Sequence, residues 1–195
     1  GVRYLTVPDH ASLDLSGDFT LEALVYPTAD GVTGGILHKG ATGVGGRYAL
    51  GRGADNKFAC VLNGAVALTS PGACPKDQWY YVAAARTGSS LKLYVNGVEV
   101  AAATYGTAIA PDANPLYLGL WNNTAAIFPG ALDFVRIHAR GLDGMEIAGR
   151  WAVDTVNLDD DMMELFAATT KYNDFGLLPT AEGLSRMAQA LSDII

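Results

Sequence analysis

The sequence predicts an all-β sandwich of antiparallel strands, on three observations. Residues 77–100 hold three apolar stretches joined by two short turns, and residues 91–95 alternate in the period-2 pattern of a strand with one buried face. Asn96-Gly97 favours a type I′ hairpin, because both residues tolerate positive φ. The composition, with 23 glycines and 17% charged residues, favours short strands and tight turns over surface helices.

The other strands follow in order, each bounded by Gly, Pro, Asn or Asp. Pro27 ends the strand that begins at Phe19, because proline cannot donate to a strand ladder. Asn63-Gly64 predicts a second hairpin. Strands are expected at residues 2–7, 19–26, 35–39, 47–52, 57–62, 65–70, 77–86, 91–95, 98–105, 116–120 and 131–139.

The pattern changes towards the C-terminus. Acidic residues 159–161 precede an apolar stretch and suit a helix start, and Thr180 is a plausible N-cap for a second amphipathic helix. We therefore expect a sandwich domain at residues 1–152 and a helical extension at 153–195. The apolar helix faces must be buried, either by folding back on the sandwich or by assembly into a homo-oligomer or a larger structure through residues 153–195.

Charge and hydropathy exclude two classes of partner. The net charge is −7, and the thirteen Lys and Arg residues form no basic run, so we expect no nucleic-acid surface. No apolar run approaches the roughly 20 residues of a membrane span, so membrane insertion is not expected. The chain begins at Gly1 rather than Met, which is compatible with removal of a leader or an upstream domain.

The two cysteines allow two interpretations. Cys60 falls in a predicted strand and Cys74 in a loop beyond the next strand. They are either two separate small apolar side chains, which we favour, or one disulfide.

Several short motifs occur in an order and at a spacing that resemble one family. The chain is similar to laminin-G-like, concanavalin A-like lectin/glucanase domains over residues 1–152, which implies a jelly-roll sandwich of two antiparallel sheets. It departs from the family at Leu24, where Trp is frequent, and at Tyr81, where His is frequent. The matching segments are residues 18–27, 36–39, 48–51, 78–83, 91–97, 116–119, 128–137 and 140–147.

We expect no catalytic activity. Related glucanases carry a Glu-x-Asp-x-Glu run on one strand, which places the carboxylates in the cleft, and this chain has no such run. Glu22, Glu99 and Asp133 each stand alone. The three histidines show no metal-ligand spacing and are expected to be isolated surface or turn residues.

The resemblance implies a possible structural Ca²⁺. In some members an Asp equivalent to Asp133 binds it together with backbone oxygens of an early turn, which corresponds here to the region of Gly17 and Asp18. The alternative is that Asp133 pairs with Arg136 or caps a turn.

The best candidate for ligand binding is the stretch from Trp121 through Asn122 and Asn123, an aromatic residue followed by amides between two strands. Trp121 could equally be a core residue. Tyr48 is a further candidate.

We expect a non-catalytic module that recognises a glycan, at the cell exterior or on a virion surface. The alternative is a structural or assembly protein, such as a capsid, tail-decoration or adhesion subunit, that uses the C-terminal helices to dock to a protein partner.

Overall fold

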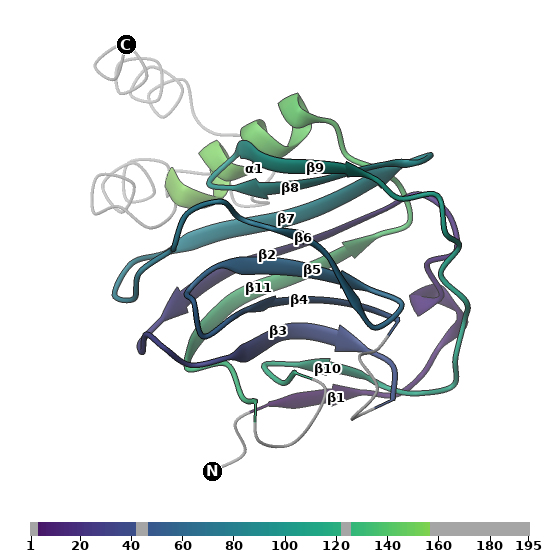
Figure 1. Ribbon diagram of the computed structural model, residues 1–195, viewed down its shortest axis with the longest axis horizontal. Coiled ribbons are helices and arrows are strands. Elements are labelled where there is room, and N and C mark those ends of the chain that lie inside the picture. The colour runs from purple at the N-terminus through teal and green to yellow at the C-terminus, as the bar shows by residue number, and fades with distance from the viewer. Residues whose placement is uncertain (1–3, 42–46, 122–125, 157–195) are drawn as a thin grey trace, which may run out of the picture. The chain divides into compact units, whose positions relative to one another are not determined.

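The computed structural model describes residues 4–41, 47–121 and 126–156. Their strands form two antiparallel sheets, which confirms the predicted all-β sandwich (Figure 1). A 3-10 turn, Ala11–Leu13, follows the first strand. The strands are β1 (Leu5–Val7), β2 (Phe19–Pro27), β3 (Gly34–Lys39), β4 (Tyr48–Arg52), β5 (Phe58–Leu62), β6 (Ala65–Thr69), β7 (Tyr80–Thr87), β8 (Ser90–Val95), β9 (Val98–Thr104), β10 (Leu116–Leu118) and β11 (Gly130–His138).

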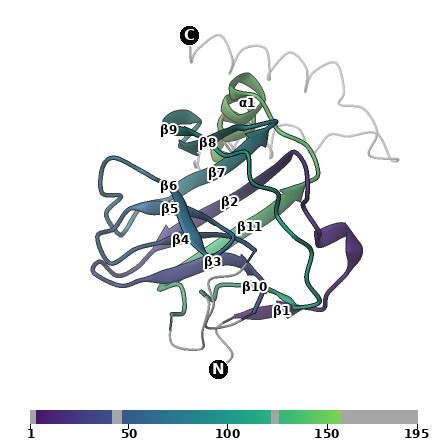
Figure 2. The ribbon, with the colours of Figure 1, turned by 45° about the vertical axis from the view of Figure 1, so that its right-hand side comes forward.

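The two sheets have different strand orders. Sheet A has the order β1-β10-β3-β4-β5-β6, and sheet B has the order β11-β2-β7-β8-β9. The turned view of Figure 2 separates β3 to β6 of sheet A from β2, β7 and β11 of sheet B. Strands distant in sequence are therefore neighbours: β10 lies between β1 and β3, so the residues before and within β10 complete the face formed by β3 and β4.

The core lies between the sheets. Phe19, Leu21 and Val25 of β2 point inward and are fully buried, as are Leu50 and Phe58 of sheet A. Each such side chain contributes roughly 1.5–3 kcal/mol by leaving water. The period-2 alternation of these strands thus orients one face of each sheet inward and leaves the other for different contacts.

Both predicted Asn-Gly hairpins are present. Asn96 and Gly97 have φ of 51° and 75°, and Asn63 and Gly64 have φ of 47° and 79°. Asn and Gly enter this left-handed region at lower cost than other residues, so these dipeptides set the register of β8 with β9 and of β5 with β6.

The two cysteines are buried free thiols. Burial raises the pKa of the Cys60 thiol to about 12, so it stays protonated and unreactive at neutral pH. They are therefore two separate apolar side chains and not a disulfide.

The final described element is the helix α1, Gly144–Val156. Its start is a reciprocal capping box: Glu146 N–H donates to Asp143 Oδ1 (2.8 Å), and Asp143 N–H donates to Glu146 Oε2 (3.0 Å). Contacts along the chain divide it into two units, Gly1–Gly149 and Arg150–Ile195, and the domain boundary expected after residue 152 stays a prediction. The predicted helices beyond residue 156 lie outside the described residues. Among the described helices, none has the length and apolar character needed to cross a membrane.

Candidate ligand-binding face

The outer face of sheet A carries a cross-strand row of three residues. Tyr117 of β10 pairs with His38 of β3, and His38 pairs with Ala49 of β4. Their chain neighbours Leu37 and Leu50 belong to the core, so the alternation of the strands turns the row away from it. Tyr117 also contacts the ring of Tyr4 edge-on, at 6.4 Å between centroids.

Trp121 lies on the same face, on a floor made by two glycines. Gly35 of β3 pairs with Gly51 of β4. A methyl group on Gly51 would overlap the Trp121 ring, and one on Gly35 would overlap the backbone of Leu120 and Trp121. The backbone of Trp121 is held by its N–H donating to the carbonyl of Ala126 (2.9 Å). The indole is therefore packed against the sheet and half-buried.

His38 is the unusual member of this face. Its side chain is 1% exposed and stacks on the Tyr117 ring at 6.2 Å and 27°. Neither Nδ1 nor Nε2 has a hydrogen-bond partner within the described part of the chain. Burial lowers the pKa of His38, against an opposing effect of Asp112, so the ring is neutral at pH 7 and offers one donor and one acceptor. Buried polar groups are normally satisfied, so an imidazole without a partner among the described residues lowers the stability of this face.

An ion-pair network, the Lys39 cluster, borders the row. It comprises Lys39, Asp9, Asp112, Asn114 and Arg47. The Lys39 ammonium is 1% exposed and lies 2.8 Å from Asp9 Oδ1 and 3.1 Å from Asp112 Oδ1. Arg47 Nε donates to Asp112 Oδ2 (3.1 Å). The cluster joins the loop before β10 to the ends of β3 and β4.

The pKa values of this cluster reflect its pairing. Burial acts to lower the pKa of Lys39, but its hydrogen bonds to Asp9 and Asp112 outweigh burial and the pKa is raised. Burial acts to raise the pKa of Asp112, but hydrogen bonds from Asn114 and Lys39 outweigh it and the pKa is lowered. Both groups are therefore charged across the neutral range.

The ligand-binding candidates chosen from the sequence lie in different parts of the chain's structure or outside the described residues. Trp121 is on the outer face of sheet A. Asn122 and Asn123 lie outside the described residues. The expectation for Tyr48 is corrected: it is 1% exposed in the core, and its hydroxyl donates to the carbonyl of Leu13 (2.9 Å), because it points inward from β4.

Asp18 and Asp133, the residues of the expected calcium site, are far apart. Asp18 precedes β2, and its Oδ1 accepts from Gly88 N–H (2.7 Å). Asp133 is exposed in a bulge of β11 opposite Leu24 and Val25, near the other end of β2. With about 3.3 Å per strand residue, roughly 20 Å separates them, so they do not bind one ion together. Within the described residues, no group of three or more His, Cys, Asp or Glu residues could hold a metal.

A second polar cluster lies on the outer face of sheet B. Glu22 is fully buried, accepts a hydrogen bond from the hydroxyl of Tyr81, and lies 2.7 Å from His138 Nε2. Arg136, the alternative partner suggested for Asp133, lies over the Phe134 ring at 3.9 Å and 3.8 Å from Glu22. The Glu22 carboxylate is enclosed, so it is not available to a substrate.

The two departures from the family pattern are neighbours on this face. Leu24 and Tyr81 pair directly across β2 and β7, and both are fully buried. We expected His38 and His138 to be isolated surface or turn residues. Both are instead strand residues: His38 of sheet A stacks on Tyr117, and His138 of sheet B contacts Glu22.

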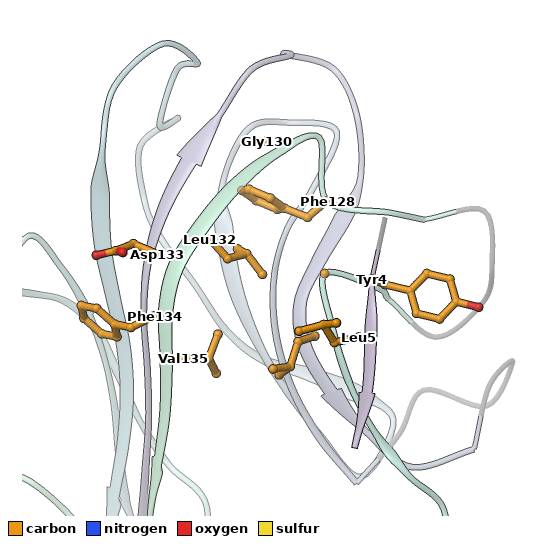
Figure 3. A pocket seen from close by; sticks show the side chains of 10 residues that line it. Tyr4, Leu5, Phe128, Gly130, Leu132, Asp133, Phe134 and Val135 are labelled. Atoms are coloured by element: carbon orange, nitrogen blue, oxygen red, sulfur yellow. The ribbon is translucent and has the colours of Figure 1, made fainter. Parts of the chain in front are cut away.

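The described residues also line an apolar cavity of about 410 Å³ between the edges of the two sheets. Figure 3 shows Phe128, Leu132 and Val135 directed into it, with Asp133 and Phe134 on the other side of β11. Its lining offers few polar groups that could orient a ligand, so the outer face of sheet A is the better candidate site.

Replacing Gly51 with alanine tests the packing of the Trp121 ring against Gly51. We expect Gly51→Ala to displace the indole and to destabilise the fold by about 1–3 kcal/mol, because the new methyl group overpacks the ring. Near-UV circular dichroism and urea unfolding measure both effects. Gly72→Ala, a position with open space around it, is the control. An unchanged Trp signal with unchanged stability would contradict this seat.

The chain belongs to the concanavalin A-like lectin/glucanases superfamily, whose sequence profile matches residues 1–148. The sheet topology described above agrees with that membership. Among curated protein sequences, none matches this chain significantly.

Three solved structures share the fold. A Bacteroides ovatus protein provisionally described as carbohydrate binding has a TM-score of 0.62 at 17% identity; the match covers 75% of this chain and 44% of that one, so this chain spans less than half of it. The Ruminococcus gnavus IT-sialidase CBM40, bound to alpha2,3 sialyllactose, has a TM-score of 0.60 at 16% identity, covering 72% and 85%. Domain 4 of AbnA, an extracellular arabinanase of Geobacillus stearothermophilus solved with arabinotriose, has a TM-score of 0.60 at 20% identity, covering 75% and 71%.

Sequence reasoning missed His38, Tyr117 and the Lys39 cluster. Only one signal pointed to this face: glycines at 35 and 51 within strand patterns, since glycine in a strand marks close approach of another segment. The face of sheet A to which His38 points depends on the bulge between Gly35 and Leu37, because the bulge shifts the alternation of side chains by one residue.

Proposed function

We propose that this protein is a non-catalytic carbohydrate-binding module whose ligand face is the outer face of sheet A. The observation that carries the proposal is the part-buried Trp121 ring, seated against Gly51 on the same face of sheet A as the part-buried Tyr117. The apolar face of a sugar ring suits contact with a seated, half-buried indole.

The likeness to carbohydrate-binding structures supports the choice of ligand class. Two of the three structures above were solved with an oligosaccharide bound. We propose a glycan partner and a location outside the cell, in line with the extracellular arabinanase that carries a domain of this fold.

The other roles considered from the sequence have less support. A glycosidase would need accessible paired carboxylates, and the carboxylate of Glu22 is enclosed. An assembly protein or virion component would act through residues 153–195, and none of the three solved structures above supports that role. Assembly through this segment stays a prediction.

Binding to a glycan array, followed by titration calorimetry on the best ligand, tests the proposal. We expect saturable binding that Trp121→Ala weakens roughly fivefold to thirtyfold, because stacking on an aromatic ring is worth of the order of 1–2 kcal/mol. Trp79→Ala is the matched control, since Trp79 packs on Tyr26 of sheet B at 5.4 Å. Absence of glycan binding, or equal binding by wild type and Trp121→Ala, would overturn the proposal.

A further inference from the structure

The Lys39 cluster has a feature that its ion pairs alone do not explain. Four oxygens surround the Lys39 ammonium: Asp9 Oδ1 at 2.8 Å, Asp112 Oδ1 at 3.1 Å, the carbonyl of Asp112 at 2.9 Å and the carbonyl of Asn114 at 2.6 Å. They come from the segment after β1 and from the loop before β10. The ammonium therefore connects three segments that are distant in sequence.

The number of contacts exceeds what directed hydrogen bonds allow. An ammonium has three N–H donors, and four acceptors lie within 3.1 Å of Lys39 Nζ, so at least one N–H is shared. The group thus acts mainly as a compact positive charge inside an oxygen cage. An all-oxygen set of two carboxylates and two backbone carbonyls is also the kind of donor set that Ca²⁺ takes.

The charges of the cluster balance only when Lys39 is present. Lys39 and Arg47 face Asp9 and Asp112, two cations against two carboxylates. The side chain of Asp112 is 11% exposed. Without the ammonium, two carboxylates and two carbonyls would converge on a cage with no cation, which is strongly unfavourable at low exposure.

The cluster is joined to the candidate ligand face through the strands and not across their surface, since Lys39 pairs with the core residues Leu116 and Tyr48. Lys39 directly follows His38 in β3, and Leu116, which pairs with Lys39, directly precedes Tyr117 in β10. Arg47 directly precedes β4, and its backbone N–H donates to the backbone carbonyl of Lys39 (2.6 Å). Holding these three strand ends together sets the relative position of His38 and Tyr117.

We propose that Lys39 is a built-in cation that occupies a latent four-oxygen metal site and positions the ligand face, so that the face works without a divalent ion. The part of this inference that concerns glycan affinity rests on the proposed function. Lys39 is a positioning residue, since it acts through His38 and Tyr117.

Removing the Lys39 side chain from the full chain tests the inference, with Ca²⁺ alone as the probe. We expect Lys39→Ala to lower the thermal midpoint by roughly 10 °C, and millimolar Ca²⁺ to restore most of that loss. Wild type should respond neither to Ca²⁺ nor to EDTA. In Lys39→Ala combined with Asp112→Asn the Ca²⁺ effect should disappear. Lys92→Ala is the matched control, because Lys92 pairs only at the surface with Glu99 and should show no Ca²⁺ response.

Glycan affinity gives the readout of positioning. We expect Lys39→Ala to bind glycan weakly and Ca²⁺ to recover its affinity, while EDTA leaves wild-type affinity unchanged. If Lys39→Ala does not fold, recovery of folded protein on refolding with Ca²⁺ supports the inference, and no recovery contradicts it. A Ca²⁺-insensitive variant, or a wild type that loses glycan on EDTA treatment, would overturn it. A wild type that binds no glycan defeats the proposed function but leaves the Ca²⁺ response of the variant as a separate result.

Discussion

We expect His38→Phe to gain stability while keeping its affinity for glycan. The imidazole is 1% exposed with two unpartnered nitrogens, and leaving a buried polar group unsatisfied costs about 1–3 kcal/mol. A phenyl ring keeps the stacking on Tyr117 without that cost. Both ring nitrogens are buried, so the same change removes no group that a sugar can reach, and glycan affinity should stay within about twofold of wild type.

The pH dependence of stability should change as well. Burial, opposed by Asp112, lowers the pKa of His38 below its ordinary value of 6.5. The stability that depends on the neutral ring is therefore complete above pH 6.5 and is lost as pH falls below it, because the unfolded chain takes up the proton first. His38→Phe should lack this loss between pH 6.5 and the lower pKa of the folded protein.

Urea unfolding at several pH values and calorimetric titration of glycan measure these effects. His10→Phe is the control, because His10 is exposed and bonds only locally to Ser12. A variant that gains stability but loses glycan affinity would show that the imidazole contacts the ligand, and would contradict this prediction. A variant that loses stability would mean that the imidazole has a partner that Phe cannot replace.

The largest loss of stability is expected for Arg52→Met. Arg52 is fully buried at the end of β4, and its guanidinium donates to the carbonyl of Cys74 (2.7 and 3.0 Å), to the carbonyl of Ala29 (2.8 Å) and to Asp30 Oδ1 (2.5 Å). The methionine side chain fills similar space but leaves these acceptors unpaired. The Asp30 side chain is 38% exposed, so the loss comes mainly from the carbonyls of Cys74 and Ala29, each of which costs about 1–3 kcal/mol when left unsatisfied.

Urea unfolding measures this loss. Arg140→Met is the matched control: the Arg140 side chain is 55% exposed and pairs with Glu146 at 2.7 Å, so its removal should cost less than about 1 kcal/mol. Because Arg52 serves the opposite end of β4 from the Lys39 cluster, Ca²⁺ should not rescue it. An Arg52→Met protein as stable as the control would show that water satisfies the freed carbonyls.

Most of the strands could be predicted from local sequence patterns. Phe19, Leu21 and Val25 are in the core as their alternation predicts, and the two Asn-Gly turns have the predicted positive φ. These features need only neighbours in sequence, because the period of a strand and the φ preference of Asn and Gly are local properties. Tyr48 shows the limit of local patterns, because the alternation of its strand does not say which of the two faces is buried.

The sequence by itself determined the sandwich, its turns, its family and the choice of Trp121. Only the tertiary structure decided what Trp121 rests on and what lies beside it. Gly51, His38 and Tyr117 come from β4, β3 and β10, and the bulge after Gly35 decides which way His38 faces. The physical reason is that a sheet face is formed by pairing distant strands, so a one-residue register shift moves a side chain between core and surface.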